Sequence, residues 1–238
     1  MSRFEAMWDR FWTDLPQGPG TSPWDVDPTY VAHAHLHLFG SVLDPALPVI
    51  DVGCGDGAQT AAIGQHFDRV MGVDVAPSAV ERARKHHGAT GATYEQLDLL
   101  KPEQAAALHD RIGDANLYVR TVLHPFTPDE LKLAVASLTH LAGSTGGAFF
   151  YELGPASRDF ILKQLGGDGE PATKFGFVFD RVPLPAVREE GTLQRELQAS
   201  GFEILSTGPI DYQGTVKSGE RYVNVPTFFI QARAKGAR

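Results

Sequence analysis

Residues 49–57 read Val-Ile-Asp-Val-Gly-Cys-Gly-Asp-Gly, an apolar run that ends in three glycines at alternating positions. Such a run predicts a buried strand that turns sharply into a helix. Glycine lets the backbone come close to a ligand, and the first turn of a helix presents unpaired N–H groups. The stretch therefore predicts a ligand-binding loop at the end of a strand.

The glycine spacing narrows the choice of ligand. Dinucleotide-binding loops normally read G-x-G-x-x-G, whereas here Gly57 comes one place early. Asp51 also stands two residues before the first glycine, where its carboxylate would repel a pyrophosphate but suit a ligand with positive charge. No Tyr-x-x-x-Lys run is present. An NAD-dependent oxidoreductase is therefore the weaker alternative.

Short apolar runs and amphipathic stretches alternate along the chain after this loop. We expect strands at 48–51, 69–73, 92–97, 115–119 and 148–153, with helices at 58–66, 77–87 and 103–111. A further helix is predicted to begin at Thr127, because Pro128 and Glu130 complete a capping signature. This alternation predicts an α/β fold with a doubly wound, mostly parallel sheet.

The regular alternation of predicted strands and helices ends after Leu153. Residues 154–185 are rich in glycine and proline, with a possible short helix at 157–165, and are expected to form a substrate-side insertion. A helix ending at Gly201 follows. Residues 202–212 and 227–234 then read as two strands joined as a hairpin. One of them should be antiparallel to the rest, which completes a seven-stranded sheet with one antiparallel strand near the C-terminus.

The first 45 residues form a separate segment, predicted to be an N-terminal helical cap on a single domain that spans 46–238. An apolar helical face there carries the aromatic side chains Phe4, Trp8, Phe11 and Trp12. A helix packed on the sheet and a lid over a ligand pocket are both compatible with this pattern.

Charge and composition restrict the partners. The chain has 29 acidic and 21 basic residues, a formal net charge of −8 and one cysteine, Cys54. An acidic surface disfavours nucleic acid and anionic membranes, and a lone cysteine forms no internal disulfide. No apolar run is long enough to span a bilayer, and no signal-peptide pattern is recognised. We therefore expect a cytoplasmic monomer or homodimer.

Acidic residues follow three successive predicted strands: Asp51 next to the glycine loop, Asp74 in Gly72-Val73-Asp74-Val75-Ala76, and Asp98 in Gln96-Leu97-Asp98-Leu99-Leu100. With the segment 118–124 after the fourth strand, they resemble the motifs of the class I methyltransferases that bind S-adenosylmethionine. The resemblance covers about residues 48–153. It implies S-adenosylmethionine as cofactor and S-adenosylhomocysteine as product.

The resemblance also implies residue roles. The loop would lie against the amino-acid part of the cofactor, Asp74 would bond both ribose hydroxyls, and Asp98 would meet the adenine amino group. The implied cofactor-binding residues are Asp51, Gly53, Cys54, Gly55, Gly57, Asp74, Val75, Asp98, Leu99 and Arg120. Without the resemblance, Asp51 could simply orient the loop, and Asp74 and Asp98 could cap the following helices.

The acceptor side is less constrained. His124 follows the fourth strand and is the candidate general base, although it could instead cap or pack a helix. Arg120 is the second catalytic candidate and could clamp an anionic acceptor or pair with Asp98. The candidate substrate residues are Trp24, Tyr30, His124, Phe126 and Tyr151. Their aromatic character favours a small aromatic molecule methylated on oxygen, nitrogen, sulfur or carbon.

Metal-dependent and nucleic-acid enzymes are disfavoured. His33, His35 and His37 alternate, but no nearby cysteine or acid completes a metal site, so no metal is expected. The acid pair of catechol-type enzymes and an Asp/Asn-Pro-Pro-Tyr/Phe run are both missing. These features favour a small-molecule acceptor. A protein that binds S-adenosylmethionine without methylating, as a cyclase, decarboxylase or sensor, stays as an alternative.

Overall fold

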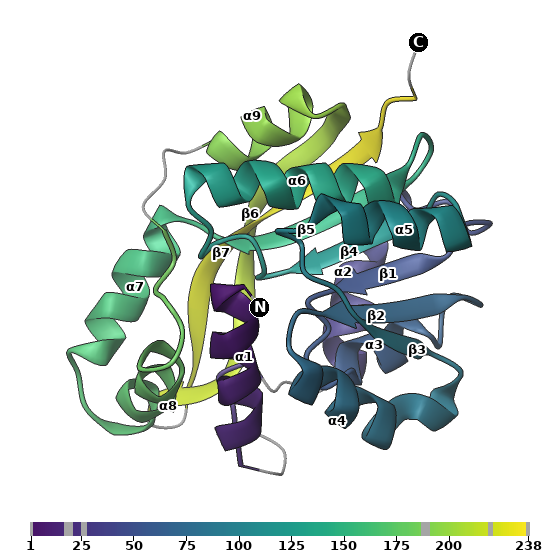
Figure 1. Cartoon of the computed structure of the whole chain (residues 1–238). Coiled ribbons are helices and arrows are strands. Elements are labelled where there is room, and N and C mark those ends of the chain that lie inside the picture. Colours follow the sequence, from purple (N-terminus) through teal and green to yellow (C-terminus); the bar gives the residue numbers. More distant parts are fainter. Residues whose placement is uncertain (1, 17–20, 25–27, 187–190, 219–220, 237–238) are drawn as a thin grey trace.

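The computed structural model describes residues 2–16, 21–24, 28–186, 191–218 and 221–236. Its centre is a seven-stranded sheet with strand order β3-β2-β1-β4-β5-β7-β6 (Figure 1). The strands are β1 (Val49–Val52), β2 (Val70–Asp74), β3 (Thr93–Gln96), β4 (Asn116–Arg120), β5 (Gly147–Leu153), β6 (Phe202–Ser218) and β7 (Arg221–Ala234). The chain order reverses at β1, which is where ligands bind in open α/β sheets.

The pairing confirms the predicted sheet. Strands β1 to β5 pair in parallel, and β7 pairs antiparallel with both β5 and β6. One strand therefore runs against the other six. The hairpin strands are longer than the predicted 202–212 and 227–234, because both continue toward their turn beyond the edge of the parallel sheet.

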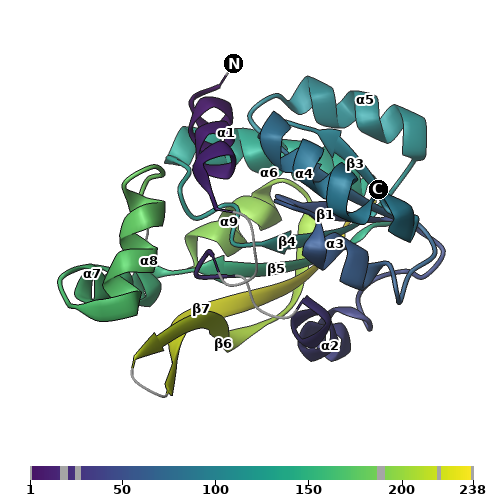
Figure 2. The same cartoon turned by 90° about the horizontal axis from the view of Figure 1, so that it is seen from below.

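Helices cover both faces of the sheet. The helices are α1 (Arg3–Asp14), α2 (Pro28–Phe39), α3 (Ala58–Ile63), α4 (Pro77–His87), α5 (Pro102–Ile112), α6 (Pro128–Ala142), α7 (Pro155–Leu165), α8 (Gly169–Phe179) and α9 (Thr192–Ala199). Helices α5, α6 and α9 lie on one face, and α2 and α3 lie on the other (Figure 2). Helices α1, α7 and α8 stand outside the carboxyl ends of the parallel strands (Figure 1).

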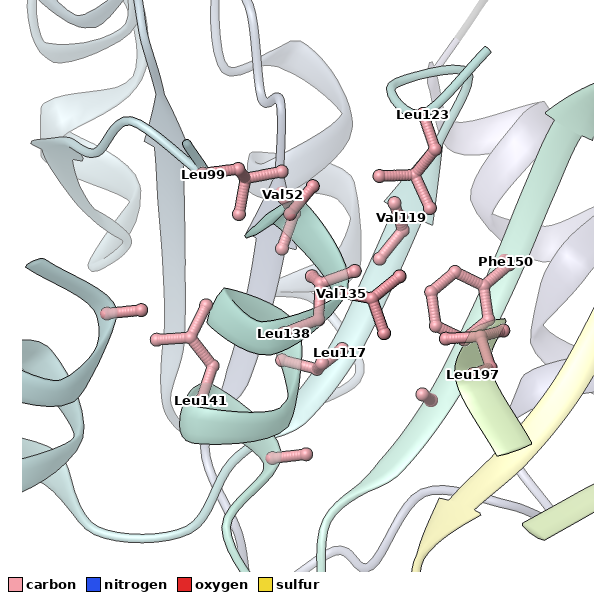
Figure 3. Close-up of a cluster of buried hydrophobic side chains, with 14 of the residues drawn as sticks. Val52, Leu99, Leu117, Val119, Leu123, Val135, Leu138, Leu141, Phe150 and Leu197 are labelled. Atoms are coloured by element: carbon pink, nitrogen blue, oxygen red, sulfur yellow. The ribbon is translucent and has the colours of Figure 1, made fainter. Parts of the chain in front are cut away.

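A buried apolar cluster holds α6 on the sheet. Leu117 and Val119 of β4 meet Val135 and Leu138 of α6, and all four side chains are 0% exposed (Figure 3). Full burial of one such side chain stabilises the fold by about 1.5–3 kcal/mol. The packing fixes the carboxyl end of β4 and the loop that follows it.

Helix α6 begins as predicted. The Thr127 hydroxyl accepts from the Glu130 N–H at 3.4 Å, and a Glu130 carboxylate oxygen accepts from the Thr127 N–H at 2.8 Å. Pro128 occupies the first turn, where no intrahelical N–H partner is needed. The predicted N-terminal helix is also present as α1.

Two helices were not expected from the sequence. Helix α2 covers the His33, His35 and His37 stretch, and α8 lies in the segment assigned to a glycine- and proline-rich insertion. Pro171 falls in the first turn of α8, where proline is tolerated, and a single glycine such as Gly176 inside a helix costs only about 1 kcal/mol. These residues therefore do not interrupt α8. In the described part of the chain, no helix is long and apolar enough to cross a membrane.

Candidate cofactor and acceptor site

A cavity of about 220 Å³ opens at the carboxyl ends of β1, β2 and β4. Its polar end is lined by Asp51, Gly53, Cys54, Gly55, Asp56, Gln59, Asp74, Val75, Asp98 and Leu99. Its apolar end is lined by Trp8, Trp24, Phe126, Leu153, Ile161, Phe175, Val178, Phe179, Val182 and Val225. Arg120 and His124 line the same cavity. The cavity thus combines carboxylates and aromatic side chains with two basic groups.

The glycine loop follows β1 and needs its glycines for two different reasons. Gly53, Gly55 and Gly57 have φ values of 73°, 55° and 82°, which other L-residues rarely adopt. A Cβ on Gly53 would collide with Val122, so Gly53 allows the loop to lie close to the segment after β4. Gly57 instead lets the start of α3 pack against Tyr94, and it does not line the cavity.

Asp74 ends β2 and holds the glycine loop. Its two carboxylate oxygens accept from the N–H groups of Gly55 and Ala76, each at 2.9 Å. Burial raises its pKa to about 6, against these backbone hydrogen bonds, which lower it. A carboxylate accepts about four hydrogen bonds, so both oxygens keep capacity for ligand hydroxyls.

Asp51 lies in β1 and lines the same cavity. One of its oxygens accepts from the Thr60 hydroxyl at 2.6 Å, and only 2% of the residue is exposed. Burial raises its pKa to about 7, whereas the Thr60 hydrogen bond and the charge of Arg120 lower it. A positively charged ligand group would stabilise the ionised form of this carboxyl.

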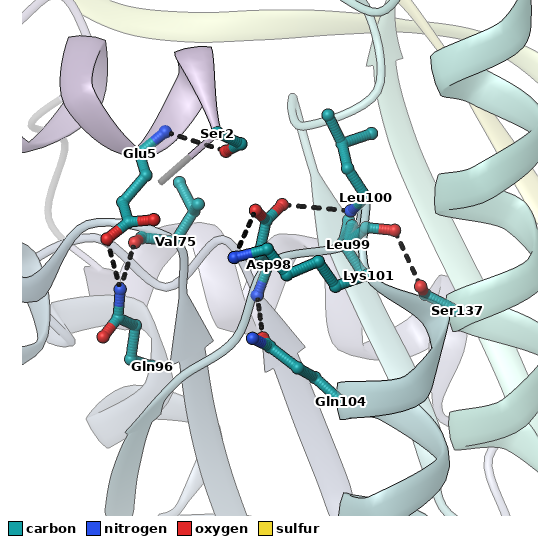
Figure 4. A network of polar contacts seen from close by, with 10 residues as sticks. All are labelled: Ser2, Glu5, Val75, Gln96, Asp98, Leu99, Leu100, Lys101, Gln104 and Ser137. Atoms are coloured by element: carbon teal, nitrogen blue, oxygen red, sulfur yellow. Dashed lines mark hydrogen bonds and ion pairs between the residues drawn. The ribbon is translucent and has the colours of Figure 1, made fainter.

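Asp98 follows β3, and its carboxylate accepts from the backbone of the turn in which it lies (Figure 4). One oxygen accepts from the Leu100 N–H at 3.0 Å, and the other lies 3.6 Å from Lys101 Nζ. The N-cap residues of α4 and α5 are Ala76 and Lys101, so neither Asp74 nor Asp98 is a helix cap. Both carboxylates line the cavity instead.

The two basic groups, Arg120 and His124, lie at the end of β4 and in the segment that follows it. Thr121 has a φ of 55°, an uncommon conformation for a β-branched residue, and its N–H donates to the Tyr151 carbonyl at 2.7 Å. His124 follows, with Nδ1 3.6 Å from a carboxylate oxygen of the buried Glu152. Strain of this kind is concentrated at functional sites.

Helix α1 closes one side of the cavity. Phe4, Trp8 and Trp12 contribute to its wall, so the N-terminal segment is packed on the molecule and also lines the site. Arg3 donates to both carboxylate oxygens of Glu130, at 2.7 and 2.6 Å.

A second group of polar contacts attaches α1 to α4 and to Arg181, which follows α8. Asp9 accepts from the Ser78 N–H at 2.9 Å, and Asp14 lies 3.2 Å from Arg181. The sequence identified the aromatic face of α1, whereas these polar contacts carried no sequence signal.

The structure brings most of the predicted site residues together. The cavity is lined by Asp51, Gly53, Cys54, Gly55, Asp74, Val75, Asp98, Leu99, Arg120, Trp24, His124 and Phe126. Tyr151 does not line it, because its ring is buried two residues before Leu153 in β5 and packs against α2, 4.8 Å from the ring of His35. The side chain of Tyr30 lies outside the described residues.

The histidine run does not form a metal site in the described part of the chain. His35 is buried, with Nδ1 2.8 Å from the Tyr118 hydroxyl, whereas His37 is exposed. The side chain of His33 lies outside the described residues. No group of three or more histidine, cysteine or acidic side chains among those described is placed to hold a metal ion.

Comparison with known proteins identifies the family to which this chain is similar. Residues 49–146 match a family model described as a methyltransferase domain. The crystal structure of a SAM-dependent methyltransferase from Anabaena variabilis has 32% sequence identity and a TM-score of 0.89. That match covers 99% of this chain and 96% of the Anabaena chain.

Two further relatives are more distant. A ubiquinone biosynthesis O-methyltransferase from Thiobacillus denitrificans is 28% identical over 120 residues, which is 50% of this chain and 50% of that protein. The match therefore spans about half the length of this relative. Magnesium protoporphyrin IX methyltransferase from Synechocystis, with bound SAH, shares the fold at a TM-score of 0.56 and 18% identity, covering 97% of this chain and 94% of that one.

Proposed function

Because the chain belongs to the family of SAM-dependent methyltransferases, we propose that it methylates a small aromatic molecule on a hydroxyl oxygen. The observation that carries this proposal is one cavity lined by three buried carboxylates and by aromatic side chains, together with Arg120 and His124. The O-methyltransferase activity in the name of the Thiobacillus relative supports the choice of oxygen.

The polar end of the cavity fits S-adenosylmethionine. The donor set consists of carboxylates, which suit ribose hydroxyls and positively charged groups, and the glycines allow close approach of the backbone. We propose that Asp74 holds the ribose, Asp98 the adenine, and Asp51 with the loop the amino-acid part. When bound, S-adenosylmethionine supplies a methyl carbon activated by a sulfonium, which an acceptor oxygen attacks as the carbon–sulfur bond breaks and its electrons stay on sulfur.

Arg120, at the end of β4, and His124, which follows it, act on the acceptor. His124 is the proposed general base that takes the hydroxyl proton as the new carbon–oxygen bond forms, and general bases of this kind accelerate reactions by about 10²–10⁴-fold. Arg120 orients the acceptor and stabilises the developing phenolate. Trp24, Phe126 and Phe175 contact its ring.

Calorimetric titration tests the cofactor assignment. We expect S-adenosylmethionine and S-adenosylhomocysteine to bind and NAD not to bind, and Asp74→Ala to reduce affinity by about 10–100-fold through lost charged hydrogen bonds. Asp129→Ala, at an exposed position on α6, is the matched control. If folded protein binds NAD but neither adenosyl ligand, the proposal is wrong.

The cellular setting is part of the same proposal. A net charge of −8 and a single cysteine favour a cytoplasmic enzyme with a small-molecule acceptor and no nucleic-acid partner. Fractionation and sedimentation would test the compartment and the choice between monomer and homodimer. Product mass after incubation with mixed acceptors would reveal a peptide or nucleic-acid substrate.

A further inference from the structure

Glu152 is a buried carboxylate next to the site that does not line the cavity. It lies near the carboxyl end of β5 and is 1% exposed. A buried charge is costly unless other groups compensate it. The partners of its two oxygens therefore indicate what the side chain does.

One oxygen of Glu152 fixes the segment after β4. Oε1 accepts from the N–H groups of Val122 and Leu123, each at 2.8 Å. These bonds continue the contact between the Thr121 N–H and the Tyr151 carbonyl at 2.7 Å. The strained turn at Thr121 is thus anchored to β5 by three consecutive N–H groups.

The other oxygen faces His124. Oε2 lies 3.6 Å from His124 Nδ1, and neither atom has a hydrogen-bond partner among the described residues. Both atoms are buried, where an unpaired polar atom is costly. The distance is longer than a hydrogen bond, so the two atoms must come closer for one to form between them.

We propose that Glu152 is a positioning residue that holds His124 in the tautomer with hydrogen on Nδ1. Nδ1–H then donates to Oε2, and Nε2, on the far side of the ring, is left unprotonated toward the cavity that His124 lines. The inference rests on the proposed role of His124 as base. Arg120, Asp51 and Asp98 line the same cavity and contribute to the field at the ring.

The Glu152→Gln variant separates positioning from anchoring. The amide oxygen can still accept from Val122 and Leu123. The amide NH₂ then faces Nδ1 and must donate to it, which places the imidazole hydrogen on Nε2. The variant therefore keeps the loop contacts and removes the base, as a wrong tautomer does in triad enzymes. Glu95→Gln, which loses only a surface pair with Arg111, is the matched control.

The first test observes the tautomer directly. Long-range ¹H–¹⁵N spectra would follow the nine histidines of the chain with S-adenosylhomocysteine bound, with His124→Gln used for assignment. We expect Nδ1–H at His124 in the wild type and Nε2–H in Glu152→Gln, with Glu95→Gln unchanged. Nε2–H in the wild type would overturn the proposal, even if the variant fails to fold.

The second test uses two acceptors that differ in ionisation. A nitrophenol is largely ionised at pH 8, whereas a simple phenol with a pKa of about 10 is not. Glu152→Gln should lower kcat about 10²-fold for the phenol and affect the nitrophenol little, because only the phenol needs a base. Equal losses for both would show that Glu152 acts only on the loop.

The two tests also separate this inference from the proposed function. If neither phenol is methylated but the tautomer changes with Glu152→Gln, the contact between Glu152 and His124 stands and the acceptor proposal fails. If the phenols are methylated and the tautomer does not respond to Glu152→Gln, the acceptor proposal stands and the inference fails.

Discussion

The ring of Trp12 lies directly on Gly55, so that a Cβ on this glycine would be 2.5 Å from Trp12 Cζ2. Trp12 belongs to α1 and is 6% exposed, whereas Gly55 belongs to the loop after β1. Both residues line the cavity. The contact therefore joins the N-terminal cap to the proposed cofactor loop, and it leaves no room for a side chain at position 55 unless Trp12 shifts.

Gly55→Ala should displace α1 as well as strain the loop. The φ of 55° alone costs an alanine about 1–3 kcal/mol, and the clash with Trp12 adds to this. We expect a lower Tm and at least about tenfold weaker binding of S-adenosylhomocysteine. Thermal unfolding and calorimetry would measure the two effects.

Gly91→Ala is the control for Gly55→Ala. Gly91 is left-handed, with a φ of 88°, but a Cβ there would meet nothing within 4 Å, so it reports backbone strain alone. Adding Trp12→Ala to Gly55→Ala should recover part of the lost stability. If the variants at Gly55 and Gly91 unfold at the same temperature, contact with Trp12 is energetically unimportant.

The raised pKa of Asp51 predicts how stability depends on pH. Its pKa rises from an ordinary value of 3.8 to about 7 because burial disfavours the charged form. Stability from the neutral carboxyl is therefore fully present below pH 3.8 and is lost as pH rises through about 7. Asp51→Asn should raise the Tm of the ligand-free protein at pH 8 and change it little at pH 4.

The affinity for S-adenosylmethionine should rise with pH, whereas the stability of the ligand-free protein should fall. A positively charged ligand favours the ionised form of Asp51, so the affinity for S-adenosylmethionine should increase between pH 6 and 8, in the range of a pKa of about 7. Calorimetry in several buffers would detect the released proton. Asp51→Asn should weaken the pH dependence, and an unchanged slope would assign it to another group, with Asp74 next because burial raises its pKa to about 6.

Local patterns were sufficient to predict the sheet and its acidic edge. Asp51, Asp74 and Asp98 could be placed together because each follows an apolar run, and parallel strands end at one edge of the sheet. The capping signature at Thr127 likewise depends only on adjacent residues.

Features that depend on tertiary contacts could not be predicted in this way. Gly176 and Pro171 suggested a loop, although their positions in α8 tolerate both residues. Tyr151 was expected in the pocket, but its ring packs against His35 of α2, a contact between distant segments that the sequence does not show. Glu152 of β5 holds the segment after β4 by accepting from the N–H groups of Val122 and Leu123, which are about 30 residues away in the sequence.

Phe175 is predicted to determine acceptor size. It lines the apolar end of the cavity and is 5% exposed. Removing its ring should raise the KM for an aromatic acceptor by about 10-fold and leave S-adenosylhomocysteine affinity nearly unchanged. Steady-state kinetics and calorimetry with Phe175→Ala would test this.

Phe177→Ala provides the comparison for Phe175→Ala. Phe177 lies in the same helix but packs against Phe11 and Arg181 and does not line the cavity. Its loss should lower stability without changing the acceptor KM. An equal rise in KM in both variants would indicate that α8 is displaced as a whole.

The pair between Arg3 and Glu130 should control the opening of α1. The pair is bidentate, and the Arg3 hydrogen bond lowers the pKa of Glu130 to about 2. Because 47% of the Arg3 side chain is exposed, Arg3→Ala should cost less than about 1 kcal/mol. Stability from this carboxylate is present above its ordinary pKa of 4.5 and is lost as pH falls through about 2, so the difference between wild type and variant should vanish there.

Release of S-adenosylhomocysteine is the sharper measurement for this pair. Freeing the first turn of α1 loosens the wall formed by Phe4 and Trp8, so we expect Arg3→Ala to increase the dissociation rate several-fold in stopped-flow experiments. Arg10→Ala removes the same charge from α1, but Arg10 pairs with Asp14 within that helix and does not attach it to α6. Faster release in Arg3→Ala alone would show that α1 must move away for S-adenosylhomocysteine to leave. Equal rates in both variants would mean that ligand leaves while α1 stays in place, through the side of the cavity lined by α8.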